Sequence, residues 1–176
     1  MRDFARELDA TVALAVPPLA ALGDERSRRH PAPGKWSPRE VIGHLIDSAS
    51  NNHQRFVRAQ FQDDLVFPGY DQDAWVRIQR YADAGWEDLV ALWAGFNRHI
   101  ARVMDATPED LLVRPRARHN LHELAWAPLP AGAPATLEFF MRDYVGHLRH
   151  HLRQVLDVGE HPWLAAAAAA SAAPAR

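Results

Sequence analysis

The final helical pattern of the chain reads DYVGHLRHHLRQV, from Asp143 to Val155. His147 and His151 in this stretch are four residues apart, so on a helix they lie on one face, one turn apart. Two imidazoles in this arrangement can bind one metal ion, with metal–nitrogen bonds of about 2.0–2.1 Å. Because two histidines do not complete a metal site, a third ligand must come from another element, and the best candidate is His44.

His44 follows the clearest helix start in the sequence. Ser37 is the expected N-cap, Pro38 occupies the first helical position and Glu40 the third, which completes a capping box. The helix is therefore expected to run from Pro38 to about Gln60.

One edge of this predicted helix is polar and lies between two apolar rows. A polar row flanked by apolar rows differs from a plain solvent face, and it indicates a helix edge that lines a pocket. The residues of the polar row are His44, Ser48, Asn51 and Arg55, with Asp47 beside them.

The remaining apolar spacing predicts three more long helices and no alternating strand pattern. The four long helices are expected over residues 3–16, 38–60, 86–104 and 136–158. Pro17 and Pro18 are expected to break or bend the first of them. Residues 114–134 carry four prolines and little periodicity, which indicates a long connection. The sequence thus predicts an all-α fold, a four-helix bundle with a long crossover connection.

Composition limits the classes of function. A chain of 176 residues with 48% hydrophobic content suits one domain, and a net charge of −2 gives no basic field for nucleic acid. The absence of cysteine excludes disulfides and Cys-ligated zinc, so any reacting thiol must be exogenous. No stretch approaches the ~20 apolar residues of a membrane span. With a charged N-terminus, this favours a cytoplasmic location. The domain is expected over residues 1–160, followed by an alanine-rich tail over 161–176 that is disordered or loosely helical.

Three segments resemble the DinB-like superfamily, and more closely its YfiT-type branch of metal-dependent hydrolases and thiol transferases. The segments are WSPREVIGHLIDS with NHQRF (36–48 and 52–56), YDQDAW (70–75) and YVGHLRHHL (144–152). The likeness extends in order and spacing from about Phe4 to Leu156, without the alanine tail.

This resemblance implies a four-helix bundle that binds a divalent metal, usually zinc or nickel, through three histidines. By position these match His44, His147 and His151, and water or substrate takes the remaining metal positions. Family members of known activity use the metal to activate a low-molecular-weight thiol, such as bacillithiol or mycothiol. No residue in the chain indicates which thiol is used, or whether a thiol is used at all.

Asp47 is a candidate for a role beside the metal. A metal-bound histidine usually donates its other ring N–H to a carboxylate or carbonyl. Asp47 is expected either to accept such a bond from His147 or His151, or to act as a general base on bound water. The alternative is a solvated or capping carboxylate.

Three further residues are candidates for binding substrate. Asn51 and Arg55 lie one and two turns beyond Asp47 and are expected to orient a substrate anion, although Arg55 also suits a structural ion pair. Tyr144 precedes His147 by three residues and is expected to line the pocket, with a core tyrosine as the alternative. Leu148 follows His147, where a metallopeptidase motif would have glutamate.

These observations predict a metal-dependent enzyme that acts on a small-molecule substrate. A divalent ion on three neutral imidazoles activates water or an exogenous thiol, so the predicted activity is that of a thiol S-transferase or a hydrolase. The resemblance favours the transferase. The alternative is a non-catalytic metal-binding bundle, a stress-associated or interaction module, which a closed metal shell without an open pocket would favour. A homodimer formed through exposed helix faces is also considered.

Overall fold

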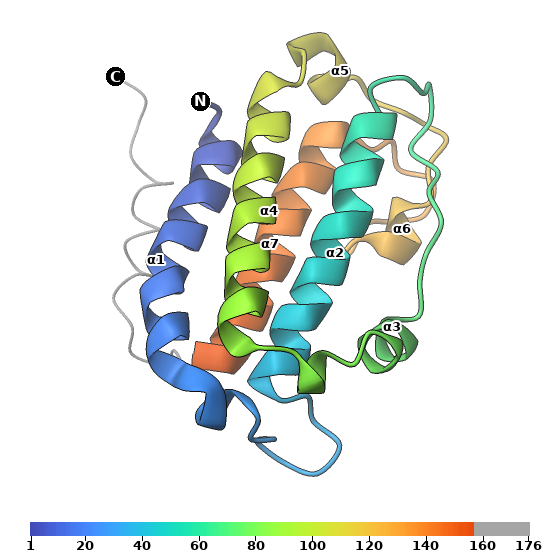
Figure 1. The fold of residues 1–176 in the computed structure, drawn as a ribbon. Helices are drawn as coiled ribbons and strands as arrows, with labels where there is room; N and C mark the ends of the chain where they lie inside the picture. Colours follow the sequence, from blue (N-terminus) through green and yellow to red (C-terminus); the bar gives the residue numbers. More distant parts are fainter. Residues whose placement is uncertain (157–176) are drawn as a thin grey trace.

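Four long helices form a bundle in the computed structural model, which describes residues 1–156 (Figure 1). Their bounds are Asp3–Ser27 (α1), Pro38–Arg58 (α2), Trp86–Ala106 (α4) and Leu137–Leu156 (α7). The shorter elements are α3 (Gln72–Ile78), the 3-10 turn η1 (Tyr81–Asp83), α5 (Glu109–Val113) and α6 (Leu121–Leu124). Residues 1–156 contain two isolated β-bridges and no strand. The predicted all-α four-helix bundle is therefore confirmed.

The order of the helices around the bundle brings α2 beside α7. Helix α4 packs against both α1 and α2, and α7 also packs against both of them. The pairs α1/α2 and α4/α7 consequently lie across the diagonals, as Figure 1 shows with α7 behind α4. The connection from α4 to α7 crosses the bundle, which agrees with the predicted crossover. The core between the helices is filled by large apolar side chains, among them Trp93, Phe56 and Phe140.

Local sequence sets the start of α2. Ser37 accepts a hydrogen bond from the Glu40 N–H, and its own N–H donates to Glu40 Oε2 over 2.7 Å. Pro38 occupies the first turn, where its missing N–H removes no helical bond. The predicted capping box is confirmed. Because it sets the first residue of α2, it also sets which side chains of the helix face the bundle.

Helix α1 continues through Pro17 and Pro18 to Ser27, so the expected helix end near residue 16 and a break at these prolines are wrong, while the alternative of a bend there stays untested. The carbonyls that the prolines leave without a helical donor belong to Ala13 and Leu14, which are exposed and open to water. The backbone instead leaves helical geometry at Gly23, where φ is 73°, a value that glycine adopts without a Cβ clash.

The long connection between α4 and α7 is tied to the loop that follows α2. Asn120 donates from Nδ2 to the Phe67 carbonyl over 2.8 Å, and its Oδ1 accepts from the Phe67 N–H over 3.0 Å. Bridges pair Leu65 with His119 and Arg116 with Ala135. These contacts hold α6 in place, where its residues line one cavity together with residues of α2 and α7.

The predicted domain end at residue 160 and the tail over 161–176 lie outside the described residues. Within residues 1–156, no helix combines the length and apolar character that crossing a bilayer requires.

Candidate metal centre

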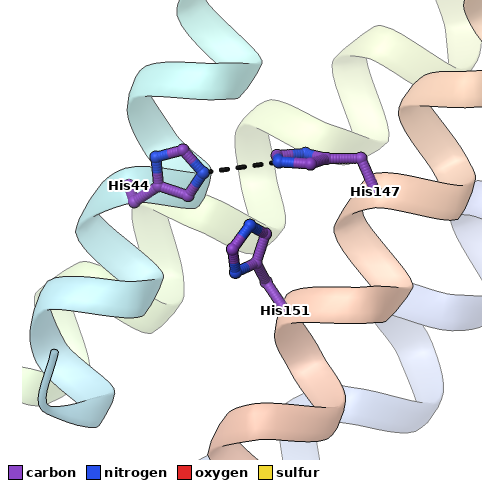
Figure 2. Close-up of side chains that lie close together, drawn as sticks. All are labelled: His44, His147 and His151. Atoms are coloured by element: carbon purple, nitrogen blue, oxygen red, sulfur yellow. Dashed lines mark hydrogen bonds between the residues drawn. The ribbon is translucent and has the colours of Figure 1, made fainter. Parts of the chain in front are cut away.

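Three histidines from two helices converge at one point of the bundle. His44 extends from α2, and His147 and His151 extend from successive turns of α7 toward it (Figure 2). Each ring offers one nitrogen as a possible ligand atom, and these three nitrogens all lie within 4.8 Å of one another. The Nε2 atoms of His44 and His147 are 3.4 Å apart. The structure therefore brings together the three residues that the sequence indicated as metal ligands.

The spacing of these nitrogens fits a shared ion. Two nitrogens bound at about 2.0–2.1 Å to one tetrahedral ion lie about 3.3–3.4 Å apart. The observed separation of His44 and His147 is in that range, and it also allows a hydrogen bond between the two rings. Within residues 1–156, these histidines are the one group of three or more histidine or acidic side chains whose ligand atoms lie close enough together to hold a metal ion. An all-imidazole donor set suits divalent transition metals, among them zinc, copper, iron and nickel.

Burial keeps the three rings in the neutral form that binds metal. His44 has no exposed surface, and burial lowers its pKa to about 3, with His151 adding to the shift. Burial likewise lowers the pKa of His147 to about 3, with further contributions from the neighbouring imidazoles. The pKa of His151 is also lowered by burial. A coordinating imidazole must give its lone pair to the ion, so protons do not compete at neutral pH.

The rings are oriented by different partners. The Nδ1 of His151 lies 2.9 Å from Gln154 Oε1, and a proton on Nδ1 leaves Nε2 free for a metal. The Nδ1 of His44 is buried, and no described residue pairs with it. The ring of His44 instead packs against Trp36, with ring centroids 5.0 Å apart. Packing against Trp36 thus orients the His44 ring, and the hydrogen bond to Gln154 orients the His151 ring.

An open cavity of about 390 Å³ adjoins the histidines between α2, α6 and α7. His147 and His151 form part of its wall, and neutral polar and aromatic groups form much of the rest. The other lining residues are Ser48, Asn52, Arg55, Gly69, Tyr70, Gln72, Glu123, Leu124, Ala125, Trp126, Phe140, Asp143, Tyr144 and His150. A small molecule can therefore reach the site from solvent.

Two of the predicted substrate residues line this cavity. Arg55 is almost fully buried and donates to Asn52 Oδ1 and to the Pro68 carbonyl, over 3.3 Å and 2.7 Å. Burial lowers the Arg55 pKa, while the Tyr70 phenol acts in the opposite direction. Tyr144 contributes its ring, since its hydroxyl donates to Asn97 Oδ1 inside the bundle.

Asn51 does not line this cavity, and its expected role in orienting a substrate anion stays a prediction. Its Nδ2 donates to the Asp47 carbonyl, and its side chain lines a separate cavity of about 200 Å³ near Pro68. The residue that lines the histidine cavity at this level is its neighbour, Asn52.

Asp47 is held by a different network from the one expected. Its Oδ1 accepts hydrogen bonds from the Tyr81 hydroxyl over 2.7 Å and from Gln79 Nε2 over 2.5 Å. Burial raises its pKa, against these two hydrogen bonds. No hydrogen bond from a histidine to Asp47 occurs in residues 1–156, and Asp47 ties α2 to the α3–η1 segment.

Two further residues of the cavity wall, Asp143 and Tyr70, were not among the site residues expected from the sequence. The Asp143 carboxylate accepts from the N–H groups of Trp126 and Ala127, over 3.0 Å and 2.7 Å. Tyr70 also lines the cavity, and burial raises its pKa to about 12 and keeps the phenol protonated. Trp126, Ala127 and Tyr70 belong to loops, and Asp143 of α7 reaches its partners only because those loops dock there.

The sequence matches the DinB superfamily over residues 6–155, and the chain belongs to this family. The match covers all of the bundle except the outermost residues of α1 and α7, and it includes the three histidines.

Two relatives illustrate the likeness. A protein of Oceanobacillus iheyensis, named a putative metal-dependent hydrolase, is 29% identical over 129 residues, which are 73% of this chain and 72% of that protein. YfiT from Bacillus subtilis is described as a probable metal-dependent hydrolase with an unusual four-helix bundle topology. Its solved structure matches with a TM-score of 0.72 at 19% identity, over 88% of this chain and 82% of that chain. That likeness establishes a shared fold.

Proposed function

We propose that the protein is a metal-dependent enzyme whose divalent ion, zinc or nickel, is bound by His44, His147 and His151. A bound ion of this kind lowers the pKa of a coordinated water to about 7 or deprotonates a coordinated thiol. The reaction is then hydrolysis, or transfer of an exogenous low-molecular-weight thiol to an electrophilic substrate. The names of the relatives favour a hydrolase, and the family resemblance favours the thiol transferase.

One observation carries this proposal: three neutral imidazoles converge beside an open cavity, and two of them, His147 and His151, form part of its wall. A structural ion usually has four protein ligands and no space beside it. In residues 1–156 no fourth histidine or acidic side chain completes the cluster. The geometry thus leaves room for a reactant and supports the enzyme over a non-catalytic metal-binding module.

Arg55 is the group that we expect to bind the substrate. Its hydrogen bonds within residues 1–156 go to neutral oxygens, and no carboxylate there forms an ion pair with it. A buried guanidinium with neutral partners attracts an anion strongly, because little water screens the charge. We therefore infer an anionic group, such as a carboxylate, at this end of the substrate, with the Tyr144 ring forming the floor.

The remaining assignments are also proposals. We assign residues 1–160 to the catalytic domain and the alanine-rich segment 161–176 to a tail. Cytoplasmic location and a homodimer stay predictions from the sequence.

Elemental analysis of the untagged protein tests the metal centre. We expect about one equivalent of zinc or nickel in the wild type and none in the His44→Ala and His147→Ala variants. The matched control is His99→Ala, since His99 also pairs with a histidine of α2, His53, over 3.2 Å, outside the cavity. Full metal retention in His147→Ala would show that the ligands are wrong.

The reaction is tested on the metal-loaded protein with a panel of activated esters, and with electrophiles supplied together with thiols. Turnover that depends on metal and on His147 supports the enzyme. If the protein binds a stoichiometric metal ion but turns over no substrate of the panel and binds no small anion, the result favours the non-catalytic alternative.

A further inference from the structure

Trp126 places an unusually exposed aromatic ring on the wall of the cavity. It follows α6 directly, lines the same cavity as His147 and is 51% exposed. Two apolar side chains, Leu124 and Phe140, lie on the wall with it. An indole left half in water presents a large flat surface that a ligand can cover.

The backbone that carries this ring is fixed. Both oxygens of the Asp143 carboxylate accept hydrogen bonds, one from the Trp126 N–H and one from the Ala127 N–H. Asp143 is itself buried and lies one turn before His147 on α7. The exposed indole is therefore attached to the same helix that supplies two of the histidines.

The sequence of α7 also makes room for the ring. A Cβ built on Gly146 would lie 3.2 Å from Cζ3 of the Trp126 ring, which is tighter than ordinary contact, and 3.4 Å from Cε3. The imidazole of His150 packs on the same indole, with centroids 5.5 Å apart and planes tilted by 35°. The indole thus lies directly against the turn that bears His147.

We propose that Trp126 is the surface on which a flat, apolar part of the substrate stacks. This proposal rests on the proposed function, and it assigns the substrate class: an anion that carries an aromatic or conjugated group. The anionic end lies at Arg55, the flat group lies on Trp126, and the reacting atoms lie beside the three histidines. Trp126 is then a specificity-determining residue that the metal does not require.

Isothermal titration calorimetry with 2-naphthoate tests this role, with cyclohexanecarboxylate as the non-planar comparison. The full-length chain is measured with and without zinc. We expect 2-naphthoate to bind more tightly than cyclohexanecarboxylate, and Trp126→Ala to weaken 2-naphthoate about tenfold or more. Trp126→Phe should retain most of the affinity, and Gly146→Ala should weaken it by displacing the ring. The control is Phe61→Ala, because Phe61 is 86% exposed and lies outside the cavity.

The outcomes separate this inference from the metal proposal. Zinc stoichiometry in Trp126→Ala should equal that of the wild type. Equal 2-naphthoate affinity in Trp126→Ala and wild type, or no binding of 2-naphthoate to the wild type, would overturn the role of Trp126 while leaving the metal centre intact. If the wild type binds no zinc, the proposed metal centre is wrong. The titrations without metal would then still decide the role of Trp126.

Discussion

The Nε2 atoms of His44 and His147 lie 3.4 Å apart, although 103 residues separate them in the chain. They meet because α2 and α7 are neighbours in the bundle while α4 and α7 are not. Ligands from two packed helices link the metal centre to the stability of the whole domain.

Zinc or nickel should therefore raise the melting temperature of the protein. A ligand that binds only the folded state stabilises it by about 2.7 kcal/mol when its free concentration is 100 times its Kd. Scanning calorimetry with and without metal should show this shift in the wild type and in His99→Ala. The shift should disappear in His147→Ala, and an unchanged shift in that variant would contradict the ligand assignment.

The stability of the metal-free protein should fall as the pH is lowered from about 6.5. Burial lowers the pKa of His44 and His147 to about 3 in the fold, so the unfolded chain binds more protons below its own histidine pKa of about 6.5. The contribution of these two histidines to the free energy of unfolding is therefore complete above about pH 6.5 and is lost progressively as the pH falls toward 3. The raised pKa of Asp47 acts in the opposite direction, since its protonated form is favoured in the fold.

Urea titrations in the presence of a chelator measure this dependence. The wild type should lose stability between about pH 7 and pH 4.5, and the slope should be smaller in the His44→Ala/His147→Ala double variant. Comparing the two slopes cancels the shared contribution of the carboxyl groups. Parallel pH profiles for the two proteins would refute the assignment of the loss to these histidines.

Two helical glycines should respond oppositely to alanine. A Cβ on Gly43 would lie 2.2 Å from Tyr81 ring atoms, whereas a Cβ on Gly95 of α4 meets nothing within 4 Å. Gly43→Ala should destabilise the protein by about 1–3 kcal/mol through overpacking beside His44. Gly95→Ala should stabilise it by about 0.5–1 kcal/mol through helix propensity. Urea unfolding checks both, and equal effects would contradict the close packing of Tyr81 on α2.

Arg55→Met should weaken anion binding selectively. In metal-free protein we expect about a tenfold to hundredfold loss of affinity for 2-naphthoate and little change for neutral 2-naphthamide. Arg58→Met is the control, because Arg58 is exposed on the same helix and lies outside the histidine cavity. Equal losses for the anion and the amide would show that Arg55 acts only through packing.

The bundle and its three histidines could be predicted from the sequence because helical periodicity carries both. The capping box at Ser37 sets the start of α2, and the spacing of His147 and His151 sets their shared face. The prolines in α1 misled the prediction, since exposure of the carbonyls one turn earlier makes them tolerable there.

The cavity could not be predicted in the same way, because seven of its sixteen lining residues lie outside the four long helices, in loops and in the short helices α3 and α6. Asn51 and Asn52 differ by one helical step, and which of them faces the cavity depends on where α6 docks. The contact of Asp143 with Trp126 joins a helix to a loop with no repeating pattern. Such contacts follow from tertiary packing, which periodicity does not specify.

The diagonal placement of successive helices also affects when the histidine cluster forms. His44 is synthesised early and its partners belong to the last described helix, so the cluster is a contact of very large sequence separation. Contacts of this kind close a long loop, so the entropy of ordering the intervening chain must be paid before they form, which slows folding. A nascent or truncated chain that lacks α7 has one histidine of the three, so full metal affinity marks a completed bundle.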